Sequence, residues 1–241
     1  MPVDPNKLAI HFGRNRNVTG PRHLGTRYDQ SGRFLPEPGN TVVCHLVRGS
    51  ETERALADAQ ARYRSMPDAG RLAFTPLESY HMTLFQGIIE GRRTHPYWPA
   101  DIAGDTPVAE MTQLMGARLN RLPLLPSFKV EVTTALPTGL LVDGLTAEDR
   151  YAMAEWRNAY ADVLGYRHPD HDSYQFHITM AYMIDWIDDE ALPKWKEMLD
   201  EVEADIRRRA PVLELRAPAF CSFEDMNWFE ELRVFDAATA A

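Results

Sequence analysis

The sequence predicts an α/β protein built from two similar lobes. Stretches with the β-branched and apolar residues of strands alternate with capped amphipathic stretches typical of helices. The order of strand, capped helix, strand and helix occurs twice, with an offset of 96 residues between the copies. In each copy the second strand carries a histidine followed two residues later by a threonine. These three observations together predict a duplicated fold.

Seven stretches have the composition or the alternation of strands. In chain order they are residues 41–47, 79–86, 128–135, 139–142, 176–181, 212–215 and 228–235. Four amphipathic stretches lie between them, with apolar residues at helical spacing. Ser50, Thr106 and Thr146 are the expected N-caps of the first three helices, and Leu192 begins the apolar stripe of the fourth. A long loop over residues 87–105 is of the kind that is often functional.

The spacing within the two copies matches closely. The 31 residues from Ser50 to His81 equal the 31 residues from Thr146 to His177. We therefore divide the chain into an N-terminal arm, residues 1–40, and one bilobal domain, residues 41–241. Lobe one covers about residues 41–125 and lobe two about residues 126–241, and the closing strands are free to cross between the lobes.

Composition limits the class of protein. With 241 residues, 44% of them hydrophobic and 25% charged, the chain has the size and balance of an ordinary globular protein. Its first residues lack the apolar core of a signal peptide, and no run approaches the roughly 18 apolar residues of a membrane span. Cys44 and Cys221 have no metal-site spacing, and a lone disulfide is possible. We expect a cytoplasmic monomer that does not bind membranes.

The charge distribution separates the arm from the rest of the chain. A net charge of −9 argues against a broad DNA-binding surface, whereas a small ligand or the end of a nucleic acid is compatible with it. Residues 1–40 contain six Lys or Arg against three acids and show no sustained periodicity. We interpret them as an irregular basic arm. Its arginines either keep the arm soluble or lie over a phosphate site.

The two His-Thr strands carry the chemistry. Because side chains alternate along a strand, His81 and Thr83 share one face, as do His177 and Thr179. Two such strands facing each other would form a cleft with two imidazoles and two hydroxyls. One imidazole can then accept a proton from a nucleophile while the other donates one to a leaving oxygen. The threonine hydroxyls can bind the phosphate oxygens, and neither a metal nor a cofactor is required.

The paired motifs resemble those of the 2H phosphoesterase superfamily, which includes cyclic nucleotide phosphodiesterases and RNA 2′,5′-ligase-like proteins. The matching segments are residues 40–45, 80–83 and 171–179, and they resemble the uncharacterised microbial branch more than the ligase branch. The resemblance implies two antiparallel sheets facing each other across a central cleft, with helices outside. It also implies that His81 and His177 act as acid and base on a cyclic phosphate or a small nucleotide phosphodiester, RNA ends included. The arm would then cap the cleft and restrict the substrate.

Four further residues are secondary candidates around this cleft. His45 is either a core histidine or part of the cleft wall. Phe85 shares the strand face of His81 and is the expected residue for stacking on a base. His171 and Tyr174 are candidates for fixing the tautomer of His177.

Two other functions are compatible with the sequence. In the first, the same cleft binds phosphorylated nucleotides or RNA ends without turnover. In the second, the polar loop from His168 to Asp172 holds a metal ion and the protein is a metallohydrolase. We favour a polar loop that holds no metal, and a phosphoesterase that depends on its paired histidines.

Overall fold

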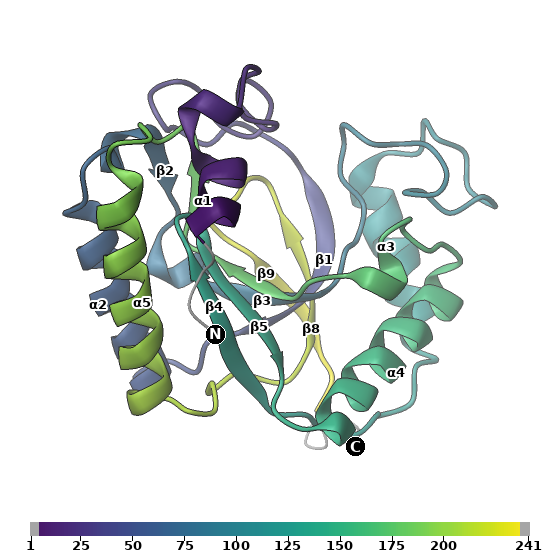
Figure 1. Ribbon diagram of the computed structural model, residues 1–241. Helices are drawn as coiled ribbons and strands as arrows, with labels where there is room; N and C mark the ends of the chain where they lie inside the picture. The colour runs from purple at the N-terminus through teal and green to yellow at the C-terminus, as the bar shows by residue number, and fades with distance from the viewer. Residues whose placement is uncertain (1–4, 237–241) are drawn as a thin grey trace.

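A seven-stranded antiparallel sheet carries both His-Thr motifs, in the strand order β4-β5-β6-β3-β1-β8-β9, and β2 and β7 form a separate two-stranded sheet. The computed structural model describes residues 5–236 (Figure 1). The strands are β1 (Gly39–His45), β2 (Leu72–Phe74), β3 (His81–Phe85), β4 (Val130–Leu136), β5 (Gly139–Gly144), β6 (His177–Thr179), β7 (Ala181–Met183), β8 (Ala219–Phe223) and β9 (Glu230–Val234). The α-helices are α1 (Pro5–Phe12), α2 (Glu51–Arg64), α3 (Val108–Leu119), α4 (Ala147–Leu164) and α5 (Leu192–Arg209).

The mixed α and β class is confirmed, but the two motif strands lie in one sheet and not in two sheets that face each other. The motif strands β3 and β6 pair with each other, so one sheet continues from β4 to β9. The order of strands is symmetrical about the β3–β6 pair, because β5 lies next to β6 on one side and β1 lies next to β3 on the other. The division into two lobes stays a prediction.

The helices form two pairs that share one hydrophobic core. In Figure 1, α2 and α5 lie together at the left and α3 and α4 at the right. A single cluster of buried side chains includes Leu56 of α2, Met111 of α3, Trp156 of α4 and Trp195 of α5. Both pairs therefore cover the same core, and the sheet closes it. Within residues 5–236, no helix has both the length and the apolar character needed to cross a membrane.

The two motif strands are buried on one face only. Met82 lies directly opposite Ile178, and both side chains are fully buried in the core. The four motif side chains alternate with these residues and are half-buried on the opposite face. The strand period of two thus separates the chemistry from the core.

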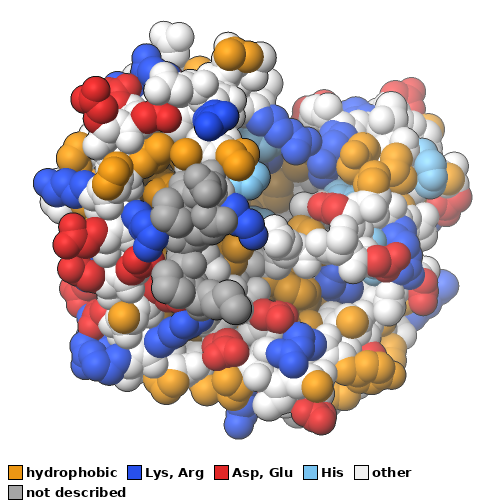
Figure 2. Space-filling view, viewed as in Figure 1, with side chains coloured by type: hydrophobic (Ala, Val, Ile, Leu, Met, Phe, Trp, Pro, Cys, Tyr) orange, Lys and Arg blue, Asp and Glu red, His pale blue; other side chains and the backbone are white. Residues whose placement is uncertain are grey.

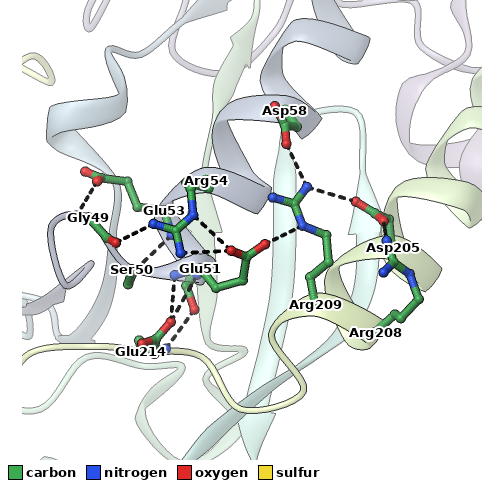
Figure 3. A network of polar contacts seen from close by, with 11 residues as sticks. Gly49, Ser50, Glu51, Glu53, Arg54, Asp58, Asp205, Arg208, Arg209 and Glu214 are labelled. Carbon is green, nitrogen blue, oxygen red and sulfur yellow. Dashed lines mark hydrogen bonds and ion pairs between the residues drawn. The ribbon is translucent and has the colours of Figure 1, made fainter.

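Polar contacts at the start of α2 confirm its predicted N-cap (Figure 3). The Ser50 hydroxyl accepts a hydrogen bond from the Glu53 N–H at 3.0 Å. The Glu53 carboxylate accepts from the Gly49 N–H at 2.7 Å, so the reciprocal contact is one residue before the cap. At the end of α5, Arg209 donates to the Glu51 carboxylate at 2.6 Å and joins the two helices.

The second copy has the complete capping box, and the helix between the copies differs from expectation. Thr146 and Asp149 satisfy each other's backbone groups at the start of α4. The prediction of a Thr106 cap is wrong, because α3 begins after Pro107 and has no side-chain cap.

The closing strands of the sheet differ in part from the prediction. Residues 212–215 form no strand, and Leu215 makes only an isolated bridge to Leu46. Pro211 and Pro218 flank this stretch and lack the N–H that a sheet requires. β8 and β9 close the sheet instead, and β9 falls within the predicted 228–235.

The N-terminal arm is more regular than predicted. Residues 5–12 form α1, whose Leu8 is buried in the core. Residues 13–38 contain no further α-helix, yet Tyr28 is buried and its hydroxyl donates to the Met183 carbonyl at 2.6 Å. The arm is therefore anchored on β7, close to the second motif.

Gly139 allows the β4–β5 turn to approach the second motif. Its φ is 144°, and a Cβ there would lie 2.1 Å from the Ile178 carbonyl oxygen. We expect Gly139→Ala to lower the free energy of unfolding by roughly 2–4 kcal/mol, because the clash is with backbone. Urea denaturation measures this, with Gly70→Ala as the control, since a Cβ at Gly70 would meet no atom within 4 Å. Equal losses in the two variants would contradict the prediction.

Candidate functional site

The register of β3 and β6 sets the order of the four motif side chains. Met82 pairs with Ile178. His81 therefore lies opposite Thr179, and Thr83 lies opposite His177. Diagonal neighbours in an antiparallel pair are about 7–8 Å apart, which is the expected separation of the two histidine backbones. Each imidazole therefore has one threonine beside it on its own strand and another across the sheet.

All four motif side chains line a single cavity of about 320 Å³. The N-terminal arm supplies part of its wall with His23 and Arg27. The arm therefore borders the cavity, and its role as a cap that restricts the substrate stays a prediction. Further lining residues come from the loop after β3, from the end of β8 and from the β8–β9 connection: Gln86, Ile89, Arg92, Phe223, Met226 and Phe229.

Both imidazoles are oriented in the same way. His81 Nδ1 donates to the Ser79 carbonyl at 2.6 Å, and His177 Nδ1 donates to the Gln175 carbonyl at 2.9 Å. A carbonyl can only accept, so Nδ1 carries the proton in each ring and Nε2 keeps a lone pair when the ring is neutral. In each copy the partner is the carbonyl two residues before the histidine. Each ring thus keeps Nε2 free for acid–base chemistry.

The His81 ring is enclosed by other rings. Its centroid lies 4.2 Å from that of Phe229 and 6.0 Å from that of His45. Burial in these surroundings lowers the pKa of His81 to about 3, and the neighbouring His45 adds to the effect. The ring is therefore neutral near pH 7 and able to accept a proton.

Tyr174 connects the two motifs. It lines the cavity with Thr83, whose side chain influences the pKa of its hydroxyl, and its ring centroid lies 5.9 Å from that of His177. The guanidinium of Arg157 lies over the same ring at 4.3 Å. Burial raises the pKa of Tyr174, so the hydroxyl stays protonated at neutral pH. Tyr174 was expected to fix the tautomer of His177; it lies beside that ring and lines the cavity, but the Gln175 carbonyl holds the Nδ1 proton.

Tyr182 makes the corresponding contact to the second threonine. It lines the cavity with Thr179, and the Arg27 guanidinium lies 5.4 Å from the centre of its ring; burial raises the pKa of its hydroxyl, and both neighbours oppose that shift. Arg27 in turn donates to the Glu37 carboxylate at 2.7 Å. A chain of polar contacts thus links the arm to the second motif.

Comparisons with known proteins identify the family. A family model named 2H-phosphodiest, described as "Domain of unknown function (DUF1868)", matches residues 27–141. The chain belongs to the 2H phosphoesterase family. It is also similar to the crystal structure of ATU0111 from Agrobacterium tumefaciens str. C58, a conserved protein of unknown function. The two share 50% identity with a TM-score of 0.95, over 97% of this chain and 100% of that one. The search of curated proteins gave no match.

Two of the secondary candidates, His45 and His171, lie outside the cavity that the four motif side chains line. His45 pairs with His81 between β1 and β3, but its Nδ1 is 3.0 Å from the Glu231 carboxylate and it lines a neighbouring cavity of about 200 Å³. His171 is buried, and its Nε2 is 3.1 Å from the Asn158 side-chain oxygen. The prediction that His171 fixes the tautomer of His177 is wrong, because a backbone carbonyl has that role.

The expectation that Phe85 stacks on a base is also wrong. Phe85 is 2% exposed and packs against Tyr160 and Tyr166 in the core. The cause is a bulge in β3, since Val42 faces Phe85 while the next residue, Val43, faces Thr83. The extra residue resets the alternation, so Phe85 turns to the buried face. The aromatic residues that line the cavity are instead Tyr174, Tyr182, Phe223 and Phe229.

The loop from His168 to Asp172 does not gather metal ligands. His168 Nδ1 bonds to the Gln86 side chain, and Asp172 is exposed near Arg167. Within the part of the chain that the structure describes, no three His, Cys, Asp or Glu side chains are grouped to hold a metal ion. This loop therefore offers no ligand set for the metallohydrolase alternative.

Several cavity residues were missed from the sequence. Tyr182 follows the second motif by three residues and was not separated from the core aromatics. Phe229 and Met226 come from the β8–β9 connection, nearly 50 residues beyond the second motif. Arg92 lies in the 87–105 loop, for which the sequence indicates only that such long loops are often functional. No local pattern in the sequence indicates that these residues meet.

We expect the His81 imidazole to stay neutral at pH 5, where a histidine with the ordinary pKa of about 6.5 is mostly protonated. Its pKa of about 3 shifts protonation to more acidic solution, because burial disfavours the charged ring. Two-dimensional ¹H–¹⁵N spectra of the imidazoles measure this, with His81→Gln to assign the signal. They should also show the proton on Nδ1. A midpoint near 6.5 would contradict the prediction.

Proposed function

We propose that this 2H protein is a metal-independent phosphoesterase that hydrolyses a cyclic phosphate or another small phosphodiester to a monoester. One observation carries the proposal: both imidazoles hold Nδ1–H on a carbonyl and leave Nε2 free, and both line one cavity. Acid–base catalysis of phosphodiester cleavage requires this pair of proton-transfer groups. Cyclic nucleotides and the cyclic ends of RNA belong to the proposed substrate class.

The two rings take different roles in the proposed reaction. His81 is the base, since its lowered pKa leaves Nε2 unprotonated at neutral pH. It takes a proton from water as the water oxygen bonds to phosphorus. His177 is the acid and gives its Nε2 proton to the leaving oxygen as the P–O bond breaks. A proton then returns from His81 to His177 through solvent, which completes the cycle.

The threonines hold the phosphate between the rings. Each hydroxyl lies on the face of the sheet that carries the imidazoles and can donate to a non-bridging oxygen. Tyr174 and Tyr182 contact Thr83 and Thr179 and limit the rotation of their hydroxyls. Donors fixed in advance stabilise charge that develops in the transition state more than mobile ones do.

We expect His81→Ala and His177→Ala each to lower kcat/KM by about 10²–10⁴-fold, the usual contribution of a general acid or base. The measurement is ³¹P NMR of product from a panel of 2′,3′- and 3′,5′-cyclic nucleotides and 2′,3′-cyclic RNA ends. His11→Ala is the control, because His11 is exposed and does not line the cavity. EDTA should leave the activity unchanged.

Three results would overturn this proposal in different ways. Tight ligand binding with no turnover across the panel would favour the non-catalytic binding module. Activity lost with EDTA and restored by a metal would favour a metallohydrolase. Full activity of both histidine variants would exclude the paired-histidine mechanism.

We expect Thr83→Val and Thr179→Val to lower kcat by about 10–100-fold, with smaller changes in KM. Valine keeps the branched shape but removes the donor that faces the phosphate oxygens. Steady-state kinetics on the best substrate measure the effect, and Thr134→Val on β4, outside the cavity, is the control. Wild-type kcat in both variants would rule out the threonines as phosphate donors.

A further inference from the structure

Three arginines that the proposed reaction does not use lie at one side of the cavity. Arg22 and Arg27 come from the arm, and Arg92 comes from the loop after β3. Among the described residues that line the cavity, none is Asp or Glu, although the whole chain has a net charge of −9. In Figure 2, Lys and Arg side chains gather next to histidine around the hollow in the upper middle of the view. The cavity thus concentrates positive charge in an acidic protein.

One of these arginines already has its partners. Arg27 pairs with Glu37 at 2.7 Å, with both side chains largely buried, and its guanidinium lies 5.4 Å from the centre of the Tyr182 ring. This pair anchors the arm and is electrically neutral. The uncompensated charge therefore belongs to Arg22 and Arg92.

Arg92 is held in place without a counterion. Its guanidinium lies 4.3 Å from the centre of the Tyr97 ring, and its Nε is buried with no hydrogen-bond partner among the described residues. Within residues 5–236 it forms no ion pair. A buried polar group without a partner is costly, and such groups in native proteins usually bind something. An anion in the cavity would supply the missing partner.

Arg22 adds a second free guanidinium beside the first. It is exposed and, in the described part of the chain, forms no ion pair. Burial lowers the pKa of His23 to about 4, and the charges of Arg27, Arg22 and Arg92, which line the same cavity, add to the effect. Like charges gathered in this way repel one another, and a bound anion relieves the repulsion.

We infer that Arg22 and Arg92 bind a second phosphate group of the substrate, separate from the phosphodiester between the histidines. A guanidinium pairs with phosphate through two parallel hydrogen bonds, which suits a doubly charged monoester. The cavity of about 320 Å³ is at the small end of the ligand sites of proteins, roughly 300–1,000 Å³. The substrate class is thus a small molecule with a phosphodiester and a second phosphate, such as a 5′-phosphorylated cyclic nucleotide. The inference rests on the proposed function only for the reaction at the first phosphate.

Binding of product-like probes tests the subsite without any turnover. Calorimetry compares adenosine 2′-monophosphate with adenosine 2′,5′-bisphosphate, and the 3′ isomers are measured in the same way. We expect the wild-type protein to bind the bisphosphate at least tenfold more tightly. The double variant Arg22→Met/Arg92→Met should lose this preference and change monophosphate affinity less than threefold. Arg92→Lys should keep part of it, because the charge remains.

The controls separate this inference from the proposed function. Arg16→Met removes one exposed arm arginine outside the cavity and should keep the full preference. His81→Ala should also keep the preference while losing turnover, so a failure of catalysis leaves the subsite test intact. Equal wild-type affinity for the two probes, or an equal loss in Arg16→Met, would overturn the inference.

Discussion

The pairing of β3 with β6 brings side chains from two distant parts of the chain onto one surface. His81 and His177 are 96 positions apart in sequence, and one antiparallel register makes them diagonal neighbours. A slip of one residue would turn one motif into the core and expose the apolar residues between. Met82 and Ile178, both fully buried, make such a slip costly. The hydrophobic core therefore fixes the geometry of the polar site on the other face.

Neutral backbone carbonyls, rather than carboxylates, orient the two imidazoles. A carboxylate partner favours the charged ring, as Glu231 does for His45, where burial nevertheless lowers the pKa overall. A carbonyl holds the same tautomer with a weaker effect, so burial dominates at His81. This arrangement keeps the His81 imidazole neutral at neutral pH, as its proposed role as the base requires.

The sequence was sufficient where the decisive interactions are local. Alternation within β3 and β6 separated the motif face from the core face, and the caps at Ser50 and Thr146 placed α2 and α4. It failed where one inserted residue or a distant segment decides the outcome. The bulge in β3 reverses Phe85, and a partner strand is needed to recognise a bulge.

The positive side of the cavity was equally hard to predict. Arg22 and Arg92 are 70 residues apart, and the arm and the loop that carry them have no periodic pattern. They line the same cavity because the arm packs beside β7 and the loop packs beside β1. Their nearness can be seen only once the chain is folded.

With an anion bound, the electrostatics of the site favour different roles for the two imidazoles of the proposed reaction, one as the acid and the other as the base. A phosphodiester adds negative charge next to His81 and raises the pKa of that ring, because an opposite charge favours the imidazolium. The increase starts from a low value at His81, where burial has already disfavoured protonation. In the proposed reaction His177, which is less enclosed, is the acid that protonates the leaving oxygen. A second phosphate on Arg22 and Arg92 would orient the ligand between two otherwise similar motifs, so that the leaving oxygen faces His177 and the attacking water faces His81.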